Sequence, residues 1–60
     1  MKALLRRYQV ERLVGLKKTA IYTMIKKGEF PKPVRLSDRA VAWKQEEIEE
    51  WIQSRQTVEV

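Results

Sequence analysis

Polar side chains with the chemistry to bind a nucleic acid recur at helical spacing between residues 17 and 27. At about 100° per residue, some of them fall within an arc of roughly 100° on one side of a helix. The residues in this arc are Thr19, Tyr22, Thr23 and Lys26. Hydroxyl groups, an aromatic ring and an ammonium group are able to contact base edges and phosphates. This arc is therefore the first candidate binding site in the chain.

The lysines in and around the arc are expected to bind phosphates, which adds affinity without reading sequence. They are Lys17, Lys18 and Lys26. The hydroxyl-bearing residues of the arc are the better candidates for contacts with base edges or thymine methyl groups. For Tyr22 a second interpretation is open, in which its ring packs against a neighbouring hairpin. The alternative for the whole arc is an ordinary solvated helix face with no partner.

Apolar residues opposite the arc must hold this helix on a core. They are Ile21, Met24 and Ile25. A shorter helix is expected before it, from about Tyr8 to Val14, with apolar residues at positions i, i+3 and i+4. These are Val10, Leu13 and Val14. Gly15 separates the two patterns, because glycine readily adopts the positive φ of a sharp corner. Two helices joined by a short glycine-containing turn form the helix-turn-helix pattern.

The second helix has a clear C-terminal signal. Two lysines lie in its last turn, where cations interact favourably with the helix dipole. Gly28 follows at the position that commonly takes a positive φ, and two prolines beyond it disfavour further helix. We therefore expect the second helix to end just before Gly28. An extended segment should follow, with Phe30 packed back on the core.

Two short alternating runs between residues 34 and 43 predict a β-hairpin, or wing. Its inward-facing residues are expected to be Val34, Leu36, Val41 and Trp43. The connection lacks an Asn-Gly or Asp-Gly pair, so we expect a loop longer than two residues. The candidate DNA contacts of the wing are Arg35, Ser37 and Arg39. Arg39 is expected to hold a phosphate or enter a minor groove; the alternative pairs it with Asp38 or with a carboxylate of the last helix.

A third helix is expected from about Gln45 to Arg55. Its buried positions follow the i, i+3, i+4 spacing and are Ile48, Trp51 and Ile52. Four glutamates on this helix raise the alternatives of catalytic acids or a metal site. These glutamates, Glu46, Glu47, Glu49 and Glu50, diverge around the helix, which favours a solvated face. Trp43 and Trp51 likewise fit core positions better than a stacking platform for single strands.

The predicted fold is mainly α with a small β-hairpin: three helices plus a wing, as a single winged helix-turn-helix domain over residues 1–60. Residues 1–8 are expected to form an extended segment at the edge of a small sheet, and residues 56–60 a frayed tail. Charge is polarised along the chain. Residues 1–44 carry a net charge of +9 and residues 45–60 a net charge of −4, which together give +5. Such asymmetry suits a protein that turns one face to a polyanion.

Composition argues against several other functions. The chain has no cysteine or histidine, so a disulfide is impossible and a zinc site or a histidine- or cysteine-based active site is not expected. No catalytic residue, metal or cofactor is predicted, and the chain is not expected to be an enzyme. An export signal and a membrane span are not expected either, since Arg6 and Arg7 interrupt the short apolar start. We expect a cytoplasmic protein.

Several short motifs fall in order at the spacing of a known family: Gly15-Leu16, Thr19-Ala20-Ile21-Tyr22, Gly28-Glu29-Phe30-Pro31-Lys32-Pro33 and Arg39-Ala40-Val41-Ala42-Trp43. From about Leu5 to Arg55, the chain resembles the AlpA family of phage and prophage regulators, which are related to MerR-type domains and to excisionases. The resemblance implies a winged helix-turn-helix regulator of transcription that binds DNA, with residues 17–27 as recognition helix and residues 34–43 as wing. MerR-type relatives carry a long dimerisation helix and an effector domain. Neither is expected within these 60 residues, and no small-molecule effector is expected.

The leading hypothesis is a sequence-specific regulator that binds double-stranded DNA, as a homodimer or in cooperative rows. Two alternatives stay open: an excisionase-like factor that bends DNA, and a small adaptor whose basic helix docks on an acidic protein. RNA binding is a third alternative, which competition with single-stranded RNA would test.

Overall fold

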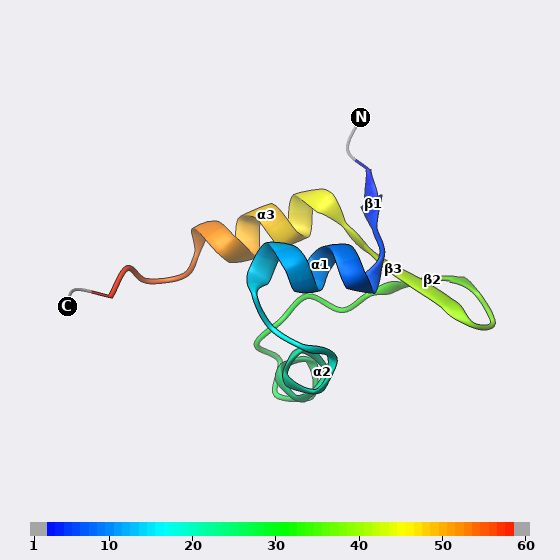
Figure 1. Cartoon of the computed structure of the whole chain (residues 1–60), viewed down its shortest axis with the longest axis horizontal. Coiled ribbons are helices and arrows are strands. Elements are labelled where there is room, and N and C mark those ends of the chain that lie inside the picture. Colours follow the sequence, from blue (N-terminus) through cyan, green and yellow to red (C-terminus); the bar gives the residue numbers. More distant parts are fainter. Residues whose placement is uncertain (1–2, 59–60) are drawn as a thin grey trace.

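A computed structural model describes residues 3–58 and contains three helices and a small antiparallel sheet (Figure 1). In chain order the elements are β1 (Leu4–Leu5), α1 (Arg7–Val14), α2 (Lys18–Lys26), β2 (Val34–Ser37), β3 (Ala40–Lys44) and α3 (Gln45–Gln53). In Figure 1, α2 and α3 lie on opposite sides of α1, and the β2–β3 hairpin projects away from the helices. This arrangement of three helices and a wing confirms the predicted fold class.

The sheet has the strand order β1-β3-β2, so β3 is its central strand. Leu4 pairs with Lys44, and Leu5 pairs with Trp43. The expected edge pairing of the N-terminal segment is therefore confirmed at Leu4 and Leu5, whereas Arg7 already belongs to α1. Met1 and Lys2 lie outside the described residues. Because β1 leads directly into α1, the sheet holds the start of that helix beside the wing.

The core takes buried side chains from all three helices, from β3 and from the segment after α2. They are Val10, Ile21, Phe30, Trp43 and Ile48. Phe30 packs on the core as predicted, and Trp43 is fully buried on the central strand. The indole N–H of Trp43 donates to the carbonyl oxygen of Pro31 at 2.8 Å. This hydrogen bond ties the segment after α2 to the sheet, and it satisfies a donor that burial would otherwise leave without a partner.

Three residues that the apolar spacing assigns to the core are exposed instead. Leu13 is 57% exposed, Leu36 46% and Ile52 39%. Helices of eight and nine residues present only a narrow stripe to so small a core, and Leu13 and Ile52 lie at its edges. Leu36 is exposed for another reason, because the strand register shifts between Arg35 and Ser37. This irregularity breaks the strict alternation of faces along β2.

The hairpin loop is shorter than predicted. β2 ends at Ser37 and β3 begins at Ala40, so Asp38 and Arg39 alone connect them. Two-residue loops commonly need positive φ, yet among the described residues only glycines have it. The shift in register beside Ser37 accommodates the tight connection instead. The prediction of a longer loop failed because it considered only the residue types in the turn. It did not allow for an irregular register in the adjoining strand.

The helix boundaries follow local signals. Gly15 ends α1 with a φ of 74°, and Gly28 follows α2 with a φ of 75°. The Gly28 N–H donates to Ile25 O at 3.0 Å and the Glu29 N–H to Met24 O at 2.8 Å. Both bonds of a Schellman motif are thus present, and the predicted role of Gly28 is confirmed.

The third helix ends at Gln53, two residues before the expected boundary at Arg55. Residues 56–58 are exposed and form neither helix nor strand, and the rest of the predicted tail, Glu59 and Val60, lies outside the described residues. Over residues 3–58, no helix has both the length and the apolar character that crossing a membrane requires.

Candidate nucleic-acid interface

The outer face of α2 brings most of the predicted contact residues together. An open hollow of about 400 Å³ on this face is lined by Lys18, Thr19, Tyr22, Thr23 and Lys26. On the opposite side of the helix, Ile21 is fully buried, and Met24 and Ile25 pack against the core. The expected division of α2 into an anchored side and a solvent-facing polar side is therefore present. We name the five hollow-lining residues the α2 face.

Tyr22 packs against the hairpin, which is one of the two interpretations that the sequence left open. Its ring lies edge-on to that of Trp43, with 6.3 Å between centroids and an interplanar angle of 64°. The side chain is half-buried, and it also lines the hollow on the α2 face. Trp43 is fixed in turn by its hydrogen bond to Pro31. The packing therefore holds the Tyr22 ring in place while leaving part of it accessible.

The remaining predicted residues are placed differently. Lys17 is the exposed N-cap residue of α2 and lies outside the hollow. In the wing, Arg35 donates from a guanidinium nitrogen to the carbonyl oxygen of Asp38 at 3.3 Å, which braces the hairpin loop. Ser37 is exposed at the end of β2. Neither Arg35 nor Ser37 joins the α2 face.

A second, smaller hollow of about 250 Å³ lies between the start of α1, the hairpin and α2. It is lined by Arg6, Arg7, Tyr8, Tyr22, Arg39 and Val41. We name it the arginine hollow. Tyr22 belongs to both hollows, so the arginine hollow adjoins the α2 face.

Sequence reasoning missed Arg6, Arg7 and Tyr8 as site residues. The adjacent Arg6 and Arg7 at the start of α1 were the available signal, because clustered arginines favour contact with a polyanion. Only pairing of β1 with β3 places them there.

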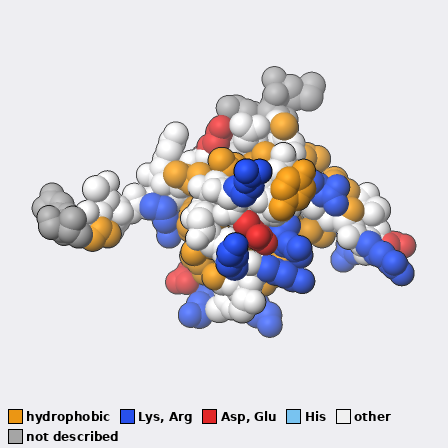
Figure 2. Space-filling view, in the orientation of Figure 1, with side chains coloured by type: hydrophobic (Ala, Val, Ile, Leu, Met, Phe, Trp, Pro, Cys, Tyr) orange, Lys and Arg blue, Asp and Glu red, His pale blue; other side chains and the backbone are white. Residues whose placement is uncertain are grey.

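The arginines of this hollow differ in their partners. Arg7 forms an ion pair with Glu11 at 3.3 Å along α1. In the part of the chain that the structure describes, the guanidinium groups of Arg6 and Arg39 have no carboxylate partner. The alternative pairing of Arg39 with Asp38 or with the last helix is thus absent there. Figure 2 shows Lys and Arg side chains spread over the lower part of the view around α2 and out along the hairpin.

Comparison with known proteins identifies the family. The sequence profile described as "Prophage CP4-57 regulatory protein (AlpA)" matches residues 3–56, nearly the whole chain. The chain belongs to the AlpA family. An uncharacterised protein of Enterobacteria phage P4, ORF88, is 43% identical over 47 residues, which cover 78% of this chain. The same alignment covers 53% of that protein, so the chain spans about half the length of its relative.

The AlpA family profile extends over both helices of the turn, the wing and α3. Membership makes the chain a relative of phage regulatory proteins, and the resemblance drawn from its motifs is confirmed. The fold and the family both fit a regulator of transcription that binds DNA through a helix-turn-helix.

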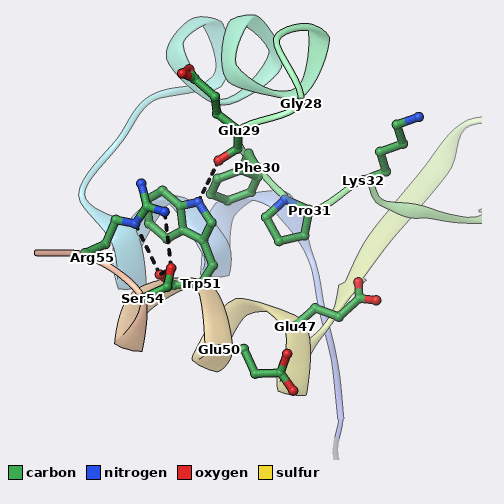
Figure 3. Close-up of a pocket in the computed structure, with 10 residues that line it drawn as sticks. All are labelled: Gly28, Glu29, Phe30, Pro31, Lys32, Glu47, Glu50, Trp51, Ser54 and Arg55. Atoms are coloured by element: carbon green, nitrogen blue, oxygen red, sulfur yellow. Dashed lines mark hydrogen bonds between the residues drawn. The ribbon is translucent and has the colours of Figure 1, made fainter.

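A third hollow of the AlpA-family chain, about 730 Å³, lies between α3 and the segment after α2 (Figure 3). Trp51 is one of the residues that line it, and its indole N–H donates to Glu29 O at 2.8 Å. The Trp51 ring meets that of Phe30 at 4.8 Å between centroids, and the Arg55 guanidinium lies 4.4 Å from the ring centroid. Trp51 is therefore half-buried and connects α3 to the segment after α2, and it is less enclosed than Trp43. Within residues 3–58, no group of three or more acidic side chains is placed to hold a metal.

Proposed function

We propose that this chain binds double-stranded DNA sequence-specifically as a phage-type regulator of transcription. The α2 helix enters the major groove, and the wing lies on the flanking backbone or minor groove. The α2 face carries this proposal, because its polar residues share one solvent-facing side while Ile21 anchors the other. The major groove of B-DNA is about 12 Å wide and admits an α-helix. The deep, narrow major groove of A-form RNA does not, which favours DNA over RNA.

Within the α2 face, the residue types suggest a division of roles. Lys18 and Lys26 neutralise phosphates, which adds affinity for any duplex. Thr19 and Thr23 contact base edges or thymine methyl groups. Tyr22 adds a contact from a ring held by Trp43, so little ordering entropy is lost when DNA binds.

The size of the recognition element suggests more than one copy on DNA. A helix of nine residues reaches few base pairs, which suits one half-site. Binding as a homodimer or in cooperative rows would let several copies contact several half-sites at once.

The test begins with selection of bound duplexes from a random pool, followed by affinity measurements on the selected duplex and on a scrambled one. Lys26→Ala should weaken binding to both duplexes by a similar factor, about five- to tenfold. Thr19→Ala should weaken binding mainly to the selected duplex, by roughly five- to a hundredfold, and so reduce discrimination.

Lys32→Ala is the matched control, because Lys32 is exposed and lines the hollow beside α3 instead of the α2 face. This substitution should leave both affinities unchanged. Failure to enrich any duplex at low salt would contradict the proposed function. Equal losses for Thr19→Ala on both duplexes would contradict only the division of roles.

A further inference from the structure

We infer that the arginine hollow is a binding seat for one phosphate of the DNA backbone. The inference rests on the proposed function and deepens it, because it assigns a second contact beside the α2 face. The residues that line the arginine hollow are Arg6, Arg7, Tyr8, Tyr22, Arg39 and Val41.

The seat draws on three parts of the chain that are distant in sequence. Arg6 follows β1, Tyr22 lies on α2, and Arg39 lies in the hairpin loop. The pairing of Leu5 with Trp43 places the start of α1 beside the wing. The same strand of the sheet, β3, begins directly after Arg39. The hollow is therefore a product of the fold.

Charge in the seat favours an anion. Arg7 shares its charge with Glu11, whereas the guanidinium groups of Arg6 and Arg39 have no carboxylate partner within the described chain. Among residues 3–58, no acidic side chain lines the hollow. Guanidinium groups match phosphate oxygens with paired N–H donors, and two residues that carry hydroxyl groups, Tyr8 and Tyr22, line the same hollow. A tetrahedral oxyanion is thus the chemistry that these side chains recognise.

The backbone that carries the arginines is already held in place. The Arg6 N–H donates to Gln9 Oε1 at 2.8 Å, and the Arg6 carbonyl oxygen accepts from Gln9 N and Val10 N, both at 3.0 Å. Arg39 lies in a two-residue loop that the Arg35–Asp38 hydrogen bond braces. Only the side chains must order when a phosphate binds, which limits the entropy lost.

Tyr22 explains why the phosphate belongs to the same DNA that α2 reads. Its ring lines both hollows, so a strand that crosses the α2 face continues into the seat. The seat therefore contributes affinity that is independent of base sequence and helps to set how α2 lies in the groove. Of the two roles expected for Arg39, phosphate binding is the one that this arrangement favours.

The experiment measures duplex affinity as a function of salt for the unmodified chain, Arg6→Gln and Arg39→Gln. Each substitution should lower the magnitude of the log–log slope, by at most about 0.9, because the two arginines share one phosphate. Each should also weaken binding to the selected and scrambled duplexes alike, by roughly tenfold at low salt. Arg12→Gln is the matched control, because Arg12 is an exposed arginine of α1 that lines none of the three hollows.

Duplexes that carry one neutral methylphosphonate locate the contact. At one position, the neutral group should weaken binding of the unmodified chain. The same group should cause no further loss of affinity in the Arg6→Gln variant. Thermal unfolding of each variant accompanies the binding data, and Arg6→Lys, which retains the charge, should restore most of the slope.

Slopes for Arg6→Gln and Arg39→Gln equal to that of Arg12→Gln would overturn the phosphate seat while leaving DNA binding by α2 intact. If Arg6→Lys does not restore the log–log salt slope of the unmodified chain, the phosphate seat is likewise overturned. If the unmodified chain binds no duplex at low salt, the proposed function itself fails. The chain could instead bind an acidic peptide and no duplex, and lose that binding in the Arg6→Gln variant. This result would assign the hollow to a protein partner and overturn the inference.

Discussion

At the scale of single residues, Tyr22 and Gly28 decide how α2 is presented. Tyr22 packs edge-on to Trp43 and lines both hollows, so its core contact and its proposed binding role coexist. Gly28 reverses the chain after α2 with a φ of 75°, which sends Phe30 back into the core. The apolar spacing around Ile21 was enough to predict the outward side of α2. The contact partner of Tyr22 was left open, because it comes from a strand about twenty residues away.

Gly28→Ala tests the backbone requirement. No atom lies within 4 Å of the position that an added Cβ would occupy, so the cost comes from positive φ alone. We expect a loss of about 1–2 kcal/mol in the free energy of unfolding. For a domain of this size this lowers the thermal midpoint by roughly 4–16 °C. Lys27→Ala, at a φ of −85°, is the control and should change stability by less than about 0.5 kcal/mol. An equal midpoint for the two variants would argue against strain at Gly28.

At the scale of elements, the hairpin departs most from the sequence-based expectation. The alternation of Val34, Leu36, Val41 and Trp43 predicted a regular wing with four inward residues. In the structure, the register shifts between Arg35 and Ser37, the loop shortens to two residues, and Leu36 is exposed. Strand alternation depends on register, and register depends on both strands and their connection, so one strand read alone does not reveal it.

The two apolar residues Trp43 and Leu36 should therefore respond differently to substitution. Trp43→Phe shrinks a fully buried ring and leaves Pro31 O without its indole donor, which should cost about 2–4 kcal/mol of unfolding free energy. Leu36→Thr should cost less than about 0.5 kcal/mol, because the side chain is already exposed. Urea unfolding followed by tryptophan fluorescence from Trp51, and by circular dichroism, measures both. Comparable losses would mean that Leu36 packs more closely than the hairpin register implies.

At the scale of the whole molecule, the acidic helix α3 lies on the other side of α1 from α2 (Figure 1). Figure 2 shows Lys and Arg side chains around α2 and out on the hairpin, with a few acidic side chains among them. Glu46 and Glu47 in the first turn of α3 favourably oppose its helix dipole. A polyanion approaching the α2 face therefore meets the basic side of the molecule first.

Salt dependence measures this electrostatic contribution. Lys18, Lys26, Arg6 and Arg39 lie in the two adjoining hollows and form no ion pair with another described residue. If Lys18 and Lys26 each neutralise one phosphate and Arg6 and Arg39 share a third, the affinity for any duplex should fall with a log–log slope of about −3. Titrations of a scrambled duplex between about 50 and 200 mM salt provide the measurement. A flat response would argue for an adaptor that docks on a protein.

The sequence by itself determined the three helices, the corner at Gly15, the end of α2 at Gly28 and the polar face opposite Ile21. Each of these depends on residues within one or two helical turns, so local spacing and backbone preference are sufficient to predict them. Tertiary structure alone decided the register of the wing, the exposure of Leu13, Leu36 and Ile52, and the meeting of Arg6 with Arg39. Those features arise where β1, β3 and α2 come together, and contacts between segments distant in sequence leave no periodic pattern to read.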